Sequence, residues 1–148
     1  MFRTVKLSLI AVLAFGSSHA IAQSTLGALL DAGAQKLTVE EFKAELMQRS
    51  LIGPTGTGIS VEVMYTSAGR ISGTSVTAFR GPGATLDGEW KADDEGRICA
   101  IMQIEISRGP QVNQLAPRCQ FWFKLGDTYY VSDSDSDRYA KILPRNLK

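Results

Sequence analysis

Residue types that carry enzymatic chemistry are scarce in this chain of 148 residues. The sequence contains one histidine, His19, and two cysteines, Cys99 and Cys119. His19 lies within the first 22 residues, which have the pattern of a cleaved export signal, so we expect the mature chain to lack an imidazole base or ligand. The remaining residues contain no Ser-x-x-Lys motif and no glycine-rich phosphate-binding motif. The sequence therefore predicts that the protein is not an enzyme and that it uses no cofactor.

Three alternating aspartates, Asp133, Asp135 and Asp137, are the candidate metal ligands. An EF-hand loop beginning at Asp133 would need glycine at its sixth position and glutamate at its twelfth, where this chain has Arg138 and Pro144. A calcium site of another kind is a weak alternative, since a divalent cation would relieve the repulsion between the carboxylates. We expect instead an exposed turn in which serine and aspartate side chains bind their own backbone, and we predict no metal site.

A second acidic cluster, formed by Asp93, Asp94 and Glu95, precedes Gly96. Hydrolysis of a glycosidic bond requires two carboxyl groups held several ångströms apart, one of them with a raised pKa. Adjacent acids before a glycine more commonly form an exposed turn. An acid-type hydrolase that uses Asp93 or Glu95 is therefore kept only as an alternative function.

The two cysteines, Cys99 and Cys119, are predicted to form one disulfide. An exported chain folds in an oxidising environment, and an even number of cysteines fits an intramolecular bond. The spacing excludes a Cys-x-x-Cys redox motif. The two positions are symmetric about Gly109, so they would face each other across a hairpin at a distance that a disulfide can span. The alternative is a pair of free thiols in the core.

Aromatic and basic side chains supply the candidate binding residues Trp122, Trp90 and Arg80. Trp122 lies between Phe121 and Phe123, so on a strand with inward phenylalanines it would face solvent or pack under a helix. Trp90 belongs to a set of aromatic residues that we expect chiefly to fill the core. Arg80 begins a loop that would be able to contact a partner.

The first 22 residues have the three parts of an export signal. Arg3 and Lys6 precede an apolar run at 7–15, and Ala20-Ile21-Ala22 fits the pattern that signal peptidase cleaves. Cleavage would leave a mature chain of 126 residues that begins at Gln23. We therefore predict a periplasmic or secreted protein.

Charge and hydropathy restrict the partners of this mature chain. It would carry 14 basic and 15 acidic residues, a formal net charge of −1, which does not favour nucleic acid or an anionic membrane. The apolar run in the signal is shorter than the ~20 residues that span a bilayer, and no other stretch approaches that length. We expect a small molecule or an envelope protein as partner, and no membrane span.

Local patterns predict a mainly β protein with one N-terminal helix. Thr38-Val39-Glu40-Glu41 is a capping box and Gly53-Pro54 is a stop signal, so the helix is expected at about 39–50. Period-two alternation and turn signals then predict six or seven strands, at 57–65, 70–79, 88–91, 97–107, 119–125, 128–132 and 138–143.

An antiparallel meander of these strands would hide its edges by curling into a small barrel, with the helix plugging one end or covering one face. The expected organisation is a signal peptide at 1–22, a lead-in segment at 23–36, either loose or a short helix, and a single β-rich domain at 37–148.

The face assignments of two predicted strands conflict. In 119–125, Cys119 shares a face with two phenylalanines, which we expect to be the buried face. In 97–107, the apolar side chains alternate on the face opposite Cys99. We expect a bulge near Met102-Gln103, which would bring Cys99 and the isoleucines that follow it to one side. The alternative is a strand buried on both faces.

Several short motifs follow one another in a characteristic order over about 37–131. They are a Leu-Thr-x-x-Glu-Phe helix, a Tyr-x-x-x-Gly-Arg-x-x-Gly hairpin, Gly88-Glu89-Trp90, Gly96-Arg97-Ile98-Cys99, Cys119 and a Gly-Asp-x-Tyr-Tyr hairpin. This order resembles that of a family of small exported proteobacterial proteins of unknown function. The resemblance implies an envelope location and no assigned activity.

Gly88-Glu89-Trp90 is also similar to the Gly-x-Trp motif of lipocalins. In lipocalins this motif opens the first strand of the barrel, whereas here two predicted strands precede it. A calycin-like barrel is therefore only an analogy, and no ligand-binding residues are carried over from it.

The sequence thus predicts an exported, non-catalytic binding module of the cell envelope. A barrel mouth or an outer sheet face would hold a small molecule or a partner protein. One alternative is an inhibitor of an extracytoplasmic hydrolase such as lysozyme, with 80–83 or 132–138 as the inserting loop; another is the acid-type hydrolase described above. A cavity of several hundred cubic ångströms inside the barrel would favour a small ligand.

Overall fold

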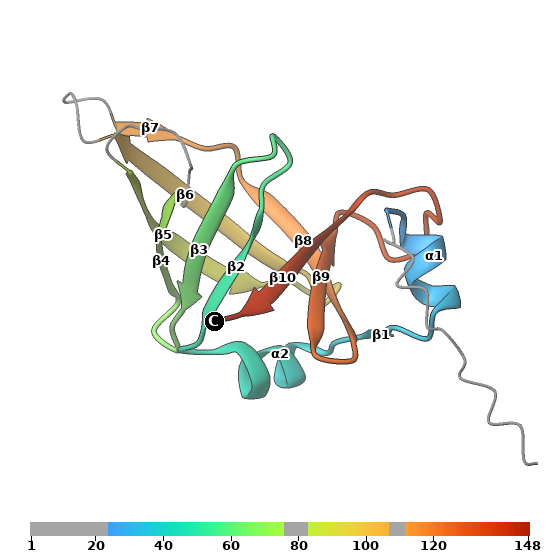
Figure 1. The fold of residues 1–148 in the computed structure, drawn as a ribbon. Helices are drawn as coiled ribbons and strands as arrows, with labels where there is room; N and C mark the ends of the chain where they lie inside the picture. Colours follow the sequence, from blue (N-terminus) through green and yellow to red (C-terminus); the bar gives the residue numbers. More distant parts are fainter. Residues whose placement is uncertain (1–23, 76–82, 107–111) are drawn as a thin grey trace, which may run out of the picture.

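The computed structural model describes residues 24–75, 83–106 and 112–148, and it contains a closed antiparallel barrel (Figure 1). Each strand of the barrel pairs with its neighbours along the chain, and the barrel closes where the last strand pairs with the first. Eight strands form the wall: β2 (Ser50–Pro54), β3 (Ser60–Tyr65), β4 (Arg70–Ser75), β5 (Ala84–Ala92), β6 (Ile98–Ile106), β8 (Arg118–Leu125), β9 (Thr128–Ser132) and β10 (Ile142–Leu147).

Two very short strands complete the pairing at the junction of β6 and β8. β7 (Val112–Gln114) pairs with the half of β6 that β8 does not reach. β1 (Gln35–Lys36) pairs with the half of β8 that β6 does not reach. Together they cover the backbone groups that the junction would otherwise leave exposed as strand edges.

Two short helices precede the barrel. α2 (Val39–Leu46) begins with the predicted capping box, in which the Thr38 hydroxyl accepts from the Glu41 N–H (3.1 Å) and the Glu41 carboxylate accepts from the Thr38 N–H (2.8 Å). The helix ends at Leu46 rather than at 50, because Gln48 has a φ of 57° and β2 already begins at Ser50. α2 lies across one end of the barrel, as Figure 1 shows.

The second helix, α1 (Leu26–Asp31), packs on the outside of the barrel. Its leucines Leu26 and Leu29 are fully buried against Phe121, Phe123 and Ile142. This outer core is separate from the core inside the barrel, which contains Phe42 and Leu46 of α2 and the inward side chains of the strands. The segment that the sequence presented as a lead-in therefore packs on the wall formed by β8 and β10.

The predicted mainly β class, the antiparallel meander and the barrel agree with the structure, whereas the predicted numbers of strands and helices are too small. The missed elements are β1, β2 and β7, and α1 is the short helix that was one of two alternatives for the lead-in segment. The sequence did not predict β2, because Ser50–Pro54 ends in a Gly-Pro pair, which is also a helix stop signal. The predicted strand at 128–132 matches β9, and the seventh predicted strand lies later, at Ile142–Leu147.

The expected bulge near Met102-Gln103 is wrong. β5 and β6 pair without interruption from Ala84↔Ile106 to Ala92↔Ile98, so β6 alternates regularly. The extra residue lies in the opposite segment instead: two residues of β6, 101 and 102, stand opposite three residues, 115–117, between β7 and β8.

The conflict between the two faces disappears because β8 is buried on both sides. Phe121 and Phe123 point outward under α1, and Trp122 points into the barrel. Cys99 and Cys119 stand directly opposite each other on β6 and β8 and form the predicted disulfide. They lie between inward-facing residues, so the disulfide joins the two strands on the outer face of the wall.

None of the helices in the described part of the chain is long and apolar enough to cross a membrane.

Candidate functional site

A cavity of about 520 Å³ lies inside the barrel, between the aromatic cluster near α2 and the loop that joins β2 to β3. This volume falls within the roughly 300–1,000 Å³ range of pockets that hold small organic ligands. Most of its wall is apolar and comes from β3 to β6 and the segment after β7: Val61, Val63, Ile71, Leu86, Ile98, Ala100, Met102, Ile104 and Leu115.

Four aromatic side chains close the cavity at the α2 end. Phe42 of α2 has its ring centroid 5.3 Å from that of Tyr65, 5.6 Å from that of Trp90 and 5.1 Å from that of Trp122. Such distances are typical of stabilising aromatic pairs. All four side chains are at most 8% exposed, so this half of the barrel is filled. Burial raises the pKa of Tyr65 to about 12, although the positive charge of Arg145 opposes the rise.

The polar part of the cavity wall centres on Arg145 of β10. The residue is 9% exposed, and its side chain reaches into the barrel. Nη1 donates hydrogen bonds to the carbonyl oxygens of Pro54 (2.7 Å) and Pro144 (2.8 Å). Within the described residues, no carboxylate lies within ion-pair distance of Arg145.

A second arginine, Arg118 of β8, borders the same cavity. Its guanidinium lies beside Gly56 in the β2–β3 loop, where a Cβ on that glycine would be 3.5 Å from Nη2. Burial lowers the pKa of the Arg145 guanidinium, and the positive charge of Arg118 lowers it further. The interaction with Tyr65 raises the pKa of Arg145. Since an arginine remains protonated at any pH a folded protein meets, the cavity carries two positive charges.

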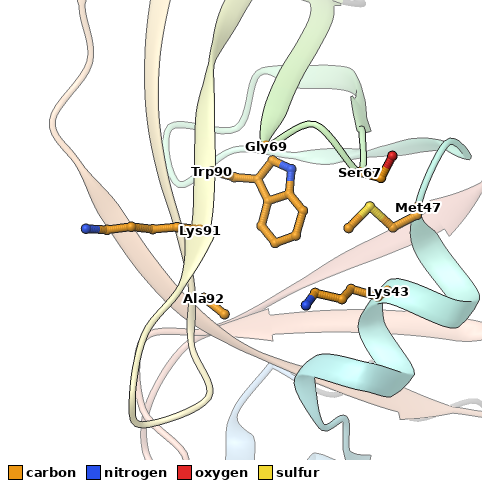
Figure 2. Close-up of a pocket in the computed structure, with 7 residues that line it drawn as sticks. All are labelled: Lys43, Met47, Ser67, Gly69, Trp90, Lys91 and Ala92. Carbon is orange, nitrogen blue, oxygen red and sulfur yellow. The ribbon is translucent and has the colours of Figure 1, made fainter.

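The structure places both predicted tryptophans in the core near α2. Trp122, which the strand pattern placed at the surface or under a helix, packs against Phe42 and borders the cavity. Trp90 donates its indole N–H to the Thr66 carbonyl oxygen (2.9 Å). One edge of the Trp90 ring borders a surface groove. Figure 2 shows Lys43 of α2 and Met47, the residue after α2, facing this ring, and Lys91 pointing to the other side of β5. Arg80 lies outside the described residues.

Asp93, a residue of the alternative hydrolase, organises the β5–β6 turn. Its Oδ1 accepts from the backbone N–H groups of Glu95 (3.1 Å) and Arg97 (2.9 Å), and its Oδ2 accepts from Nε of Arg97 (2.7 Å). Burial alone would raise the pKa of Asp93, but the hydrogen bonds from Arg97 outweigh it and lower the pKa. A lowered pKa keeps the carboxylate ionised, which does not suit a general acid.

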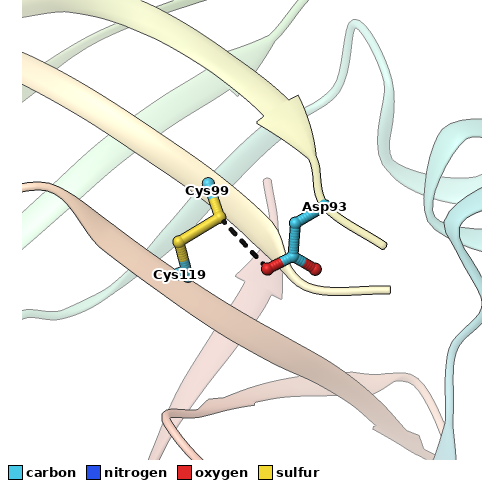
Figure 3. Close-up of side chains that lie close together, drawn as sticks. All are labelled: Asp93, Cys99 and Cys119. Atoms are coloured by element: carbon cyan, nitrogen blue, oxygen red, sulfur yellow. Dashed lines mark hydrogen bonds between the residues drawn. A yellow bond between two sulfur atoms is a disulfide. The ribbon is translucent and has the colours of Figure 1, made fainter. Parts of the chain in front are cut away.

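Asp93 also lies beside the disulfide, as Figure 3 shows, with its Oδ2 3.7 Å from the sulfur of Cys99. Asp93, Cys99 and Cys119 are the only group of three potential ligands that the described residues bring within 4.8 Å of one another. Both sulfurs are bonded to each other, and the thiolate is the form of cysteine that binds metals. The oxidised protein therefore offers one carboxylate here, not a three-ligand site.

The three alternating aspartates have three separate partners. Asp133 accepts from Gln120 (2.9 Å), Asp135 pairs with Lys36 (2.8 Å), and Asp137 accepts from the Tyr139 N–H (2.9 Å). In this segment the Ser134 hydroxyl accepts from two backbone N–H groups, those of residues 136 and 137. The carboxylates are not gathered into a common cation site, and the segment has the self-bonded turn that its composition predicts.

A polar cluster of Glu45, Lys124 and Tyr129 fastens α2 to the barrel wall. The Glu45 carboxylate accepts from Nζ of Lys124 (2.6 Å) and from the Tyr129 hydroxyl (2.7 Å). The hydrogen bond from Lys124 lowers the pKa of Glu45 most, followed by that from Tyr129. These contacts keep Glu45 ionised, Lys124 protonated and Tyr129 neutral. The cluster is therefore structural and is not arranged for proton transfer.

Sequence reasoning missed Arg145 and Arg118. Leu143, Arg145 and Leu147 occupy alternate positions along β10 and therefore share one face, and both leucines pack against the inner core. An arginine at an inward position of a strand is the signal that would have identified it, but the predicted strand ended at 143. Arg118 precedes Cys119 and fell outside the predicted strand that begins there.

Comparison with known proteins gives this chain no relative: it matches no family model, no curated protein and no solved structure.

Proposed function

We propose that this protein is a non-catalytic binding protein that holds a small, largely apolar molecule inside its barrel. The observation that carries the proposal is the cavity of about 520 Å³, whose walls are apolar over β3 to β6. A barrel of this size can pack its interior completely with side chains or enclose one small ligand, and only the second use leaves such a volume. The two arginines at the cavity supply the few polar groups that a ligand pocket needs for orientation.

We also propose that the protein acts outside the cytoplasm, in the periplasm or as a secreted protein. Residues 1–22 support this with a basic segment, an apolar run and a small-residue cleavage pattern. The Cys99–Cys119 disulfide supports it independently, because such bonds persist in oxidising compartments.

The two alternative functions have less support. Of the two candidate inhibitory loops, residues 80–82 of the segment 80–83 lie outside the described residues. The segment 132–138 is tied down by the ion pairs Asp135–Lys36 (2.8 Å) and Arg138–Asp31 (2.6 Å). A hydrolase would need a carboxyl group with a raised pKa, and that of Asp93 is lowered. We therefore give the binding function precedence.

Titration with N-phenyl-1-naphthylamine tests the proposal, because this uncharged apolar dye fluoresces strongly when it leaves water. We expect saturable binding with one dye per purified, oxidised chain. Ala100→Phe fills part of the cavity and should weaken binding about tenfold or more, since lost burial of a few apolar groups is worth at least that factor.

Ile101→Phe is the matched control, because the adjacent side chain points outward and is 45% exposed. It should bind the dye like the original chain. Circular dichroism reports whether each variant is folded, and Ala84→Phe replaces Ala100→Phe if the latter is not. Absence of saturable binding to the original chain, or unchanged binding to a folded cavity-filling variant, would refute the proposal.

A further inference from the structure

The cavity has two chemically different sides. The strands β3 to β6 contribute aliphatic side chains, whereas β8, β10 and the β2–β3 loop contribute Arg118, Arg145, Gln120 and threonine hydroxyls. A molecule that matched this wall would be apolar over most of its length and polar at one end. The question is which polar group the arginines would accept.

The hydrogen bonds of Arg145 leave most of its donors available. A guanidinium has five N–H groups, and the two on Nη1 are used by the carbonyl oxygens of Pro54 and Pro144. Nη2 and Nε make no hydrogen bond to the described residues. Since no side-chain nitrogen there is both buried and without a partner, these atoms retain accessible surface, and Arg145 lines the cavity.

Two prolines and a glycine near Arg145 explain the position of its Nη1, but they offer no hydrogen-bond partner to Nη2 and Nε. Pro54 and Pro144 have no N–H, so the ladder between β2 and β10 stops at Asn146↔Ile52 and Nη1 binds the two carbonyls beyond it. Gly53 makes room for this: a Cβ there would overlap the Pro144 carbonyl oxygen and lie 2.7 Å from Nη1. The guanidinium is thereby fixed in place, with Nη2 and Nε directed elsewhere.

The charge balance at the cavity selects an anion. Burying a cation without a counter-ion is costly, and proteins normally pair such a group. Arg145 is buried and Arg118 is exposed, and among the described residues neither has an acidic partner within ion-pair distance. Arg70, Arg97 and Arg138, by contrast, each pair with an aspartate. A ligand carboxylate would supply the missing charge, and a guanidinium binds carboxylates with strong, directional hydrogen bonds.

We infer that the barrel binds an amphiphile with one anionic headgroup, of the type of a medium-chain carboxylate. Arg145 and Arg118 bind the headgroup, and the aliphatic side chains of β3 to β6 cover the tail. This inference rests on the proposed function, because it assumes that the cavity is the binding site.

Displacement of N-phenyl-1-naphthylamine by decanoate and by decan-1-ol tests the inference. The two competitors share their tail and differ in the headgroup, and decyltrimethylammonium adds the opposite charge. We expect decanoate to displace the dye at a concentration about tenfold or more below that of decan-1-ol, and the cationic competitor to be the weakest, because charge-assisted hydrogen bonds to arginine distinguish them.

Arg145→Met should remove the preference for decanoate over decan-1-ol, measured as the ratio of the two displacement constants on the same variant, and Arg118→Met should reduce this ratio. Arg70→Met is the control, since Arg70 lies outside the barrel and pairs with Asp87 (2.6 Å). If Arg145→Met does not fold, the ratio of decanoate to decan-1-ol on the original chain decides alone.

The outcomes separate the two claims. Equal displacement by decanoate and decan-1-ol would overturn the inference and leave the proposed function standing. A preference for decanoate that persists in both arginine variants would also overturn it, because the headgroup would then be bound elsewhere. Failure of the dye itself to bind would overturn the proposed function, and this inference with it.

Discussion

The two halves of the barrel interior use inward-facing side chains in opposite ways. In the plugged half, Phe42 of α2 enters the barrel and meets Tyr65, Trp90 and Trp122, so that large rings fill the space. In the open half, the inward residues are smaller or charged, and they line a cavity of about 520 Å³ instead of filling it. The same alternating pattern along a strand therefore fills one end of the barrel and lines a cavity at the other.

The difference follows from a helix that covers one half and a buried charge in the other. The plugged half has a helix to cover it, and α2 is positioned by its capping box and by the ion pair between Glu45 and Lys124 (2.6 Å). The open half has Arg145, whose charge cannot be packed against apolar neighbours without a large desolvation cost. An inward arginine beside the β2–β3 loop thus prevents the close packing that four aromatic rings achieve at the other end.

Truncation of one side chain in each half should give the largest contrast. Phe42→Ala removes a ring that is 1% exposed and contacts three other rings, so we expect a loss of about 3–5 kcal/mol in the free energy of unfolding. Met102→Ala shortens a half-buried side chain that already borders a cavity, so it should cost about 1 kcal/mol, the transfer free energy of the buried part of that side chain. Urea unfolding of both variants measures the two values, and equal losses would contradict the distinction between the halves.

Removal of the disulfide should have the next largest effect. The bond joins β6 to β8 beside Ala100 and Arg118, which border the open half. Replacement of both cysteines by serine should lower the free energy of unfolding by about 3 kcal/mol, the chain-entropy value for a loop of this length. Urea unfolding of the double variant, compared with the original chain before and after reduction, provides the measurement. A loss below about 1 kcal/mol would mean that the barrel closes without this bond.

Unfolding at alkaline pH should report the burial of the Tyr65 phenol, which lies between the two halves. Its pKa is raised by burial from 10.0 to about 12, so the folded state holds the phenolic proton more tightly than the unfolded state. The resulting stabilisation is complete below pH 10 and is lost as the pH rises through about 12, a change of about 2–3 kcal/mol.

Tyr65→Phe tests this pH dependence, because phenylalanine cannot ionise. Its free energy of unfolding should fall less between pH 10 and pH 12 than that of the original chain. If both chains lose the same stability over this interval, the phenol of Tyr65 is not shielded from water as the structure indicates.

The sequence contained more information on the elements of the barrel than on its cavity. The capping box at Thr38 and Glu41 and the alternation of Val61, Val63 and Tyr65 are local signals, and the helix begins at Val39 and the strand ends at Tyr65 as these signals predict. The pairing of Cys99 with Cys119 was also predictable, because the chain has only two cysteines and they lie on predicted antiparallel neighbours.

The open half depends on relations that no local pattern contains. Whether an inward side chain fills space or lines a cavity depends on what faces it from the other strands, as for Arg145 and Gly53 on β10 and β2. The orientation of Trp122 was misjudged for a similar reason: α1 covers the outer face of β8, so the neighbouring phenylalanines are buried outside the barrel. A helix packed on the outside reverses the rule that the more apolar face of a strand points inward.

Energy transfer from Trp122 to N-phenyl-1-naphthylamine would test most directly that the open half is the binding site. Trp90→Phe leaves Trp122 as the only tryptophan, and this indole borders the cavity. We predict that its emission falls on titration and saturates at one dye per chain, and that Ala100→Phe in the same background abolishes the effect. Quenching that does not saturate, or that persists in the folded Ala100→Phe variant, would show that the dye binds elsewhere and would contradict the account.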